Sequence, residues 1–296
     1  MIPALLFFAS LVNDVRGFIA RHDLPAAERQ LRAYQAQAGA TPEFAAALSW
    51  LARGALDAKE YDRAQTLAAE TRKVTLELLR THGLDNDPWL PTALGASIEV
   101  QAQALAARGG RSEAIAFLRE QAGLFGATSL GERIHKNINL LTLEGKPAPE
   151  LEASQWLGGQ RASLAGLRGH TVLLFFWAHW CGDCKPELPI LANLQRMYGP
   201  QGLVIIGPTR LYGFIAGGLE AAPAVETQYV EAVRRQWYTG LERMPVPLGA
   251  ANFEAYGAST IPTLVLIDAS GIVRLYHPGA ITEAELSTRI LAVVRR

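Results

Sequence analysis

The sequence predicts an α + α/β protein, in which a domain of helical hairpins precedes a mixed β-sheet with helices on both faces. Up to about residue 143, apolar residues recur at three- and four-residue spacings among Ala, Glu, Gln and Arg, which is typical of amphipathic helices. Beyond residue 149, short apolar runs alternate with helical patterns, as expected for strands buried on both sides. Gly145, Pro147 and Pro149 interrupt regular structure between the two. We therefore expect domains at 1–143 and 150–296, joined by a linker at 144–149.

The helical half repeats one arrangement three times: a helix, a short polar turn and a second helix centred on a small residue. Ala27, Ala64 and Ala114 take that position, where a small side chain lets paired helices approach closely. The arrangement resembles tetratricopeptide hairpins, whose repeat is about 34 residues, although these alanines are 37 and 50 residues apart. Two uses stay open: a concave surface that holds a partner, and a plain helical bundle for stability or dimerisation.

The second half carries the patterns of a mixed sheet. Its three continuous apolar runs suit buried strands, and a turn signal at 268–271 predicts a hairpin. A capping box from Thr282 to Glu285 opens a last helix. The expected elements are strands at 172–177, 203–206, 264–267 and 272–276, and helices at 187–198, 225–237 and 283–294.

The charge balance excludes partners that depend on clustered positive charge. Lys plus Arg equals Asp plus Glu, at 28 each, and the chain has no long basic run. Neither a nucleic acid nor an anionic membrane surface is therefore an expected partner.

The apolar N-terminal stretch within Met1–Leu11 has two interpretations. It is too short to span a bilayer, and no Lys or Arg precedes it as in a signal peptide. It is either the first half of a buried helix that continues through Val15 and Phe18, or the remnant of a signal.

The only two cysteines, Cys181 and Cys184, lie between an apolar run and a helical pattern. A helix N-terminus offers partial positive charge and unpaired N–H groups, which favour the nucleophilic thiolate. We expect both thiols at the exposed start of this helix, with Cys181 attacking and Cys184 resolving the mixed disulfide. Asp183 should raise the thiol pKa and Lys185 should lower it, and the sequence does not say which effect dominates.

Other uses of the two cysteines fit less well. A structural zinc site needs four ligands, and His179 is the one nearby addition. Covalent haem attachment requires His after the second cysteine, where the chain has Lys185. A purely structural disulfide would close a loop too short to contribute much stability. Thiol–disulfide exchange is the remaining interpretation.

The run Trp177-Ala178-x-Trp180-Cys181-Gly182-x-Cys184-Lys185 resembles the active site of the thioredoxin superfamily. Its surroundings are similar to the TlpA-like thiol–disulfide oxidoreductases, close to the redoxin group. Three further segments carry the resemblance: the opening segment at 145–151, the turn at 163–170 and the proline loop at 259–263.

This resemblance implies roles for particular residues. Cys181 would be the nucleophile, Cys184 the resolving thiol, and Pro262 a cis-proline that faces the disulfide beside the backbone groups of Ile261. Glu187 would relay a proton near the buried sulfur, or would simply complement the helix dipole as a first-turn acid. No cofactor is implied. The residues expected to contact a substrate are Trp180, Gly182, Asp183, Arg210, Tyr212, Ile261 and Pro262.

The sequence also departs from the family pattern. Phe175 stands where thioredoxins keep a buried Asp, so Cys184 needs another proton acceptor, such as Glu187 or water. The segment 207–223 is longer and more aromatic than the usual loop after this strand. It is either a recognition flap near Cys181 or a surface insertion packed on its own aromatic rings. A peroxiredoxin usually has Thr three positions before its peroxidatic cysteine, and this chain has Ala178 there, so a peroxidase is the less favoured interpretation.

These observations predict an enzyme that exchanges thiols and disulfides with a protein substrate and with an upstream electron donor or acceptor protein. The alternative is an interaction protein whose helical domain binds a partner and whose cysteine pair is regulatory or vestigial. The resemblance implies an extracytoplasmic location, in the periplasm or facing the membrane, with the cytoplasm as the alternative.

Overall fold

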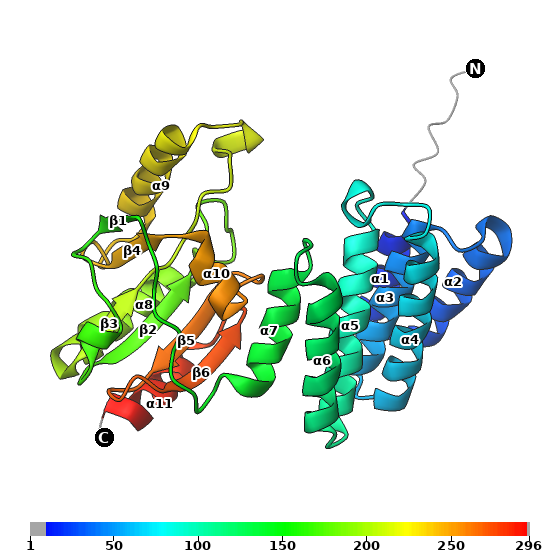
Figure 1. The fold of residues 1–296 in the computed structure, drawn as a ribbon, viewed down its shortest axis with the longest axis horizontal. Coiled ribbons are helices and arrows are strands. Elements are labelled where there is room, and N and C mark those ends of the chain that lie inside the picture. Colours follow the sequence, from blue (N-terminus) through cyan, green and yellow to red (C-terminus); the bar gives the residue numbers. More distant parts are fainter. Residues whose placement is uncertain (1–9, 295–296) are drawn as a thin grey trace. The chain divides into compact units, whose positions relative to one another are not determined.

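The computed structural model describes residues 10–294 of the chain (Figure 1). The chain divides into two compact units, Met1–Ile134 and His135–Arg296. The interpretation of Met1–Leu11 falls almost wholly on residues 1–9, outside the described residues. The linker predicted at 144–149 stays a prediction, and the two units meet within a helix that precedes it.

The first unit is helical, as the sequence predicted. Its elements are α1 (Leu11–Ala20), α2 (Leu24–Ala38), α3 (Pro42–Asp57), α4 (Tyr61–Leu78), the 3₁₀ turn η1 (Leu84–Asn86), α5 (Leu90–Ala107) and α6 (Arg111–Phe125). The pairs α1–α2, α3–α4 and α5–α6 pack as hairpins. Ala27, Ala64 and Ala114 are fully buried where the second helix of each hairpin meets its neighbours, as expected of a close-approach position. The tetratricopeptide comparison itself stays a prediction.

Local sequence signals explain where α2 and α3 begin. The side chain of Asp23 accepts the N–H of Ala26, and the hydroxyl of Thr41 accepts the N–H of Phe44 at 3.1 Å. Each cap satisfies an N–H that has no partner inside the helix. Proline follows within the first two positions of both helices, where its missing N–H costs nothing.

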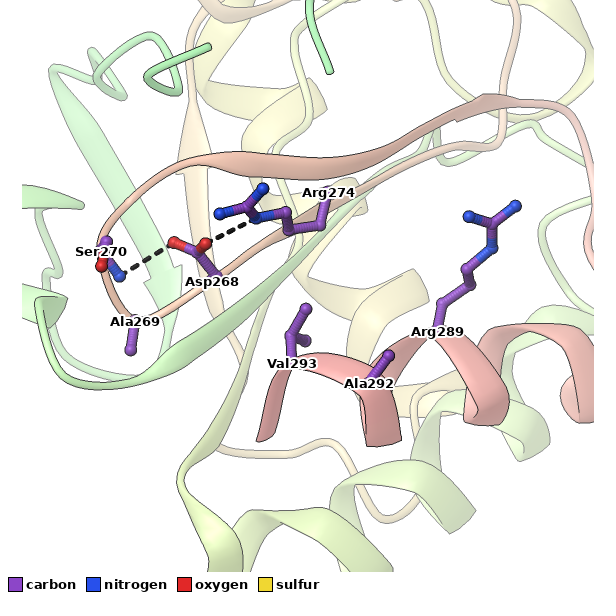
Figure 2. Close-up of a pocket in the computed structure, with 7 residues that line it drawn as sticks. All are labelled: Asp268, Ala269, Ser270, Arg274, Arg289, Ala292 and Val293. Atoms are coloured by element: carbon purple, nitrogen blue, oxygen red, sulfur yellow. Dashed lines mark hydrogen bonds and ion pairs between the residues drawn. The ribbon is translucent and has the colours of Figure 1, made fainter. Parts of the chain in front are cut away.

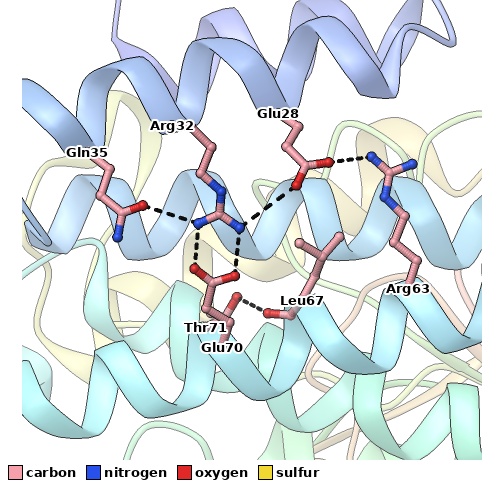
Figure 3. A network of polar contacts seen from close by, with 7 residues as sticks. All are labelled: Glu28, Arg32, Gln35, Arg63, Leu67, Glu70 and Thr71. Atoms are coloured by element: carbon pink, nitrogen blue, oxygen red, sulfur yellow. Dashed lines mark hydrogen bonds and ion pairs between the residues drawn. The ribbon is translucent and has the colours of Figure 1, made fainter.

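Polar side chains connect α2 to α4 along their solvent-facing edges (Figure 3). Arg32 binds both carboxylate oxygens of Glu70, and Arg63 binds Glu28 at 2.6 Å. All four side chains are roughly one-third exposed, so water screens the pairs and their main effect is on helix orientation.

The second unit contains a four-stranded mixed sheet of order β3-β2-β5-β6 and a two-stranded ribbon of β1 and β4 (Figure 1). Strand β3 runs parallel to β2, and β5 runs antiparallel to both β2 and β6. Its strands are β1 (Gln155–Gly158), β2 (Thr171–Phe176), β3 (Leu203–Ile206), β4 (Pro245–Leu248), β5 (Thr263–Ile267) and β6 (Val273–Pro278). Its helices are α8 (Glu187–Tyr198), α9 (Pro223–Trp237), α10 (Ala250–Tyr256) and α11 (Glu283–Val294), and α7 (Gly131–Thr142) enters it from the first unit.

Both faces of the four-stranded sheet are covered, because successive residues of β2 point to opposite sides. Leu173 and Phe175 pack with α8, α9 and α11 in one apolar cluster. Leu174 and Phe176 pack with Phe253 and its neighbours on α10 in the other. The mixed sheet with helices on both faces is therefore confirmed, and β2 lies at its centre.

The ribbon of β1 and β4 was not predicted. Pro245 and Pro247 make β4 unlike a strand, because proline cannot donate to a ladder. Their carbonyls still accept: Gly207 donates to Pro245 at 2.9 Å and Thr209 to Pro247 at 3.1 Å. Strand β4 thus binds the backbone of the chain that leaves β3.

Among residues 10–294, no helix is both long and apolar enough to cross a membrane.

Candidate active site

The site is built where β2 ends, at the fully buried Trp177. Its indole N–H donates to the carbonyl of Gly207 at 2.9 Å, and its backbone N–H donates to Pro208 at 3.2 Å. The hydroxyl of Thr209 donates to the carbonyl of Trp177 at 2.8 Å. These bonds join the end of β2 to the start of the loop at 207–222, which follows β3.

Residues 178–186 form a tight turn before α8, here called the cysteine turn. Cys181 and Cys184 are joined by a disulfide. The N–H of Cys181 donates to Ala178 at 3.1 Å, and the N–H of Cys184 donates to Sγ of Cys181 at 3.0 Å. A donor aimed at this sulfur favours negative charge on it once the disulfide opens.

The expectation of exposed thiols at the first residues of a helix is wrong in two respects. Helix α8 begins at Glu187, so both cysteines lie in the turn before it. Cys181 is only 5% exposed and Cys184 only 2%. The residues that surround the disulfide leave a hollow of about 10 Å³, which is room for about one water molecule. They are Ala178, His179, Lys185, Leu188, Val233, Trp237 and Tyr238. A substrate must therefore meet the disulfide at the surface.

Glu187 is a buried carboxyl group at the start of α8, 3% exposed. Burial raises its pKa above the ordinary value of 4.5, although a hydrogen bond from the backbone of Ile281 partly opposes the shift. Within residues 10–294, its Oε2 atom has no hydrogen-bond partner. A buried carboxyl group of raised pKa, three residues after Cys184, is suited to holding or releasing a proton.

The proline loop meets the cysteine turn through the sheet. Phe176 of β2 pairs with Thr263 of β5 in antiparallel register, so the next positions outward are Trp177 and Pro262. The Ile261–Pro262 peptide bond is cis. Ile261 packs against the apolar cluster that contains both cysteines.

The 207–222 loop reaches the cysteine turn through aromatic side chains. The ring of Tyr212 lies 5.3 Å from that of Trp180, edge to face, and Trp180 is 50% exposed. Arg210 lies over the rings of Tyr212 and Phe253, at 5.2 and 4.6 Å. Trp180, Arg210 and Tyr212 are thus brought together beside Cys181.

The remaining predicted residues lie on the outer side of the cysteine turn. Gly182 and Asp183 are exposed, and Asp183 makes no hydrogen bond or ion pair with any residue of the described chain. The ammonium of Lys185 lies 4.2 Å from the ring centre of Trp237 on α9, which is 44% exposed. Trp237 forms an aromatic border of the disulfide hollow that the sequence did not predict as part of the site.

A buried pair, His179 and Glu226, was also not predicted as part of the site. Nε2 of His179 lies 3.1 Å from Oε1 of Glu226, and both side chains are 1% exposed. The residues are 47 positions apart, so no spacing in the sequence could indicate the contact. Within residues 10–294, no three His, Cys, Asp or Glu side chains converge as metal ligands.

A separate pocket of about 390 Å³ lies between the 268–271 turn and α11 (Figure 2). Asp268 accepts the N–H of Ser270 at 2.9 Å and pairs with Arg274 at 2.6 Å, while Arg289 extends from α11. Pro262 precedes β5 and Asp268 follows it, so roughly 17 Å of strand lies between them. This pocket is therefore no part of the cysteine site.

Comparison with known proteins places the cysteine site in a family. The family model described as Redoxin matches residues 143–290. The thioredoxin-like protein YneN of Bacillus subtilis is 28% identical over 148 residues, which are 50% of this chain and 78% of that protein. The thiol-disulfide oxidoreductase ResA of Bacillus anthracis is 32% identical over 144 residues, which are 48% of this chain and 73% of that protein.

A solved structure is also similar, that of a thiol:disulfide interchange protein of the thioredoxin family from Chlorobium tepidum. It has a TM-score of 0.39 and 23% identity, and the match covers 51% of this chain and 97% of that one. The family match spans half of the chain and includes the whole cysteine turn, the 207–222 loop and the proline loop. The chain belongs to the redoxin family.

Proposed function

We propose that this protein is a thiol–disulfide oxidoreductase that acts on a protein substrate through Cys181 and Cys184. One observation carries the proposal: the two cysteines form a disulfide whose Cys181 sulfur accepts the N–H of Cys184, beside the half-exposed Trp180. Membership of the redoxin family and the names of the relatives support the same chemistry. The hollow of about 10 Å³ beside the disulfide has room for about one water molecule, which favours a macromolecular substrate that meets the disulfide at the surface.

In the reducing direction, the thiolate of Cys181 attacks one sulfur of a substrate disulfide. A bond forms between Cys181 and that sulfur, and the second substrate sulfur leaves as a thiolate and takes up a proton. Cys184 then loses its proton and attacks Sγ of Cys181, which releases the first substrate sulfur. Two electrons have passed to the substrate, and the Cys181–Cys184 disulfide is the product. The reverse sequence would oxidise a substrate dithiol.

Glu187 is the group we propose to accept the proton of Cys184. Phe175 is fully buried on β2 and has no proton to exchange, so another acceptor is required. The raised pKa of Glu187 brings it closer to neutral pH, where a carboxyl group exchanges protons more readily.

The substrate chain would bind across the cysteine turn, between the proline loop and the 207–222 loop. Ile261 would offer backbone groups to an extended segment from one side, beside the cis-proline Pro262. Trp180 and Tyr212 would contact apolar side chains from the other, with Arg210 supporting Tyr212. Gly182 and Asp183 are exposed on the turn and would meet the substrate directly.

This chemistry requires no cofactor, because the cysteine pair itself carries the two electrons. It does require an upstream protein that reduces or reoxidises the pair. We propose an extracytoplasmic location on the basis of family resemblance, and a further partner for the helical unit. The direction of electron flow depends on the reduction potential of the pair.

Reduction of insulin by dithiothreitol, followed as turbidity, tests the proposal. The wild-type protein should accelerate precipitation, and Cys181→Ser should behave as buffer. If the wild type and Cys181→Ser give the same rate, the oxidoreductase proposal is wrong and a regulatory or vestigial pair becomes the better explanation.

A further inference from the structure

The carboxylate of Glu226, in the first turn of α9, is a buried junction between two segments of the site. Its Oε1 atom accepts the N–H of Tyr212 at 2.6 Å, and its Oε2 atom accepts the N–H of Gly213 at 2.8 Å. Nε2 of His179 lies 3.1 Å from Oε1. One side chain from α9 therefore binds both the backbone of the 207–222 loop and the cysteine turn.

The imidazole of His179 is enclosed by aromatic rings. The rings of Tyr212, Phe214 and Tyr229 meet it nearly at right angles, at centroid distances of 5.8, 5.3 and 5.4 Å. Tyr212 and Phe214 belong to the 207–222 loop, and Tyr229 to α9. The loop thus packs around a residue that lies two positions before Cys181.

Burial of His179 and Glu226 costs hydration free energy, which apolar side chains packed in the same place would not lose. A carboxylate and an imidazole removed from water lose hydration, and an apolar pair of similar volume would serve stability as well. Hydrogen bonds to Glu226 do what apolar contacts cannot, because they fix the direction of two loop N–H groups. The backbone carrying the Tyr212 ring is therefore held in one orientation against Trp180.

We propose that Glu226 is a positioning residue for substrate recognition. Through His179 and the amides of Tyr212 and Gly213, it holds the 207–222 loop against the cysteine turn. Trp180 and Tyr212 then form a fixed aromatic subsite for an apolar side chain next to the substrate cysteine. The inference rests on the proposed function. It states which substrates the subsite selects: polypeptides with an apolar residue beside the reacting cysteine.

Glu226→Gln tests the proposal, because an amide cannot accept all three donors. Glu220→Gln is the matched control, since Glu220 is an exposed glutamate of the same loop. Stoichiometrically reduced protein is mixed with increasing insulin or oxidised glutathione, and oxidation of the cysteine pair is measured by quenched-flow alkylation. Each substrate then gives a half-saturating concentration and a limiting rate.

Glu226→Gln should raise the half-saturating insulin concentration about tenfold, as expected for loss of a charged hydrogen bond. Its limiting rate and its oxidation by glutathione should change much less, and Glu220→Gln should match the wild type. Equal losses with insulin and glutathione would mean that Glu226 serves the chemistry, which overturns the positioning role. An unchanged half-saturating concentration overturns it as well.

Amide hydrogen exchange of the wild-type protein provides a test that needs neither activity nor a folded variant. The N–H groups of Tyr212 and Gly213 should exchange on the order of a hundredfold more slowly than that of Gly217 at the exposed part of the loop. Comparable exchange at these positions contradicts the anchoring. If the wild type reacts with glutathione but not with insulin, the proposed protein substrate is wrong, while the exchange data still decide whether Glu226 anchors the loop.

Discussion

The backbone N–H of Cys184 donates a hydrogen bond of 3.0 Å to Sγ of Cys181. The donor belongs to the resolving cysteine and the acceptor to the attacking one, so the two sulfurs are not equivalent. When the disulfide is reduced, this N–H and the start of α8 behind it should stabilise a thiolate on Cys181.

The two cysteines of the reduced protein should therefore differ in reactivity towards iodoacetamide. Cys181 should alkylate at least about tenfold faster than Cys184 at pH 7. Peptide mass spectrometry of a time course measures both residues in one sample.

Trapping variants extend this comparison to substrates. Cys184→Ser should accumulate mixed disulfides at Cys181, whereas Cys181→Ser should accumulate few at Cys184, which is nearly covered. Equal reactivity of both cysteines, with equal trapping, would contradict their ordered roles.

Glu187 should make the stability of the protein depend on pH. Burial raises the pKa of this carboxyl group above 4.5. Its contribution to stability is therefore fully present below about pH 4.5 and is lost as the pH rises through the folded-state pKa. Glu187→Gln cannot ionise, so its stability relative to wild type should increase from pH 4 towards pH 8.

Urea unfolding of the oxidised proteins across this range measures the trend. Glu285→Gln is the matched control, because Glu285 is an exposed first-turn acid of α11 and its charge stays in water. A difference between Glu187→Gln and wild type that stays constant with pH would show that burial does not bias this group.

His179 should make the stability of the protein depend on pH in the direction opposite to that of Glu187. Burial lowers its pKa below 6.5, although the hydrogen bond to Glu226 partly opposes the shift. A lowered pKa means that stability is present above pH 6.5 and is lost as the pH falls through the folded-state pKa. The NMR titration of the His179 ring should therefore have its midpoint below 6.5.

The variant His179→Asn should lack this acid-dependent loss of stability, while His170→Asn, at an exposed position of the same unit, should retain it. A His179 midpoint above 6.5 would mean that Glu226 stabilises the imidazolium more than burial disfavours it. The contact between His179 and the carboxylate of Glu226 would then be an ion pair rather than a hydrogen bond from a neutral imidazole.

The local parts of the fold were predictable because their signals are local. Strand β3 and helix α8 have the bounds that their apolar periodicity predicted, and α9 begins two residues earlier at Pro223. The N–H of Glu285 donates to the hydroxyl of Thr282 at 3.3 Å, as the capping box requires. Strands β1 and β4 have four residues each, and the prolines of β4 conceal it from any pattern.

The residues that surround the disulfide were not predictable, because they come from segments distant in sequence. Val233 and Trp237 of α9 line the hollow around the cysteines, and they account for the burial that the helix-start argument missed. Glu226 meets His179 only because α9 packs beside the cysteine turn. The motif predicted the reacting atoms, whereas tertiary packing determines what surrounds them.

Asp183, between the two cysteines, should have only a small effect on their reactivity. Its side chain is exposed and makes no ion pair within residues 10–294, so water screens its charge from the sulfurs. Lys185 is also exposed, and its ammonium lies over the ring of Trp237.

We expect Asp183→Asn to increase the alkylation rate of Cys181 by less than about threefold, and this difference should become smaller at high salt. Alkylation at 20 mM and 500 mM salt checks this, because the Debye screening length is roughly five times shorter at the higher concentration. Glu220→Gln is the exposed-acid control. A tenfold or salt-independent change would show that the carboxylate of Asp183 approaches the sulfur once the disulfide opens.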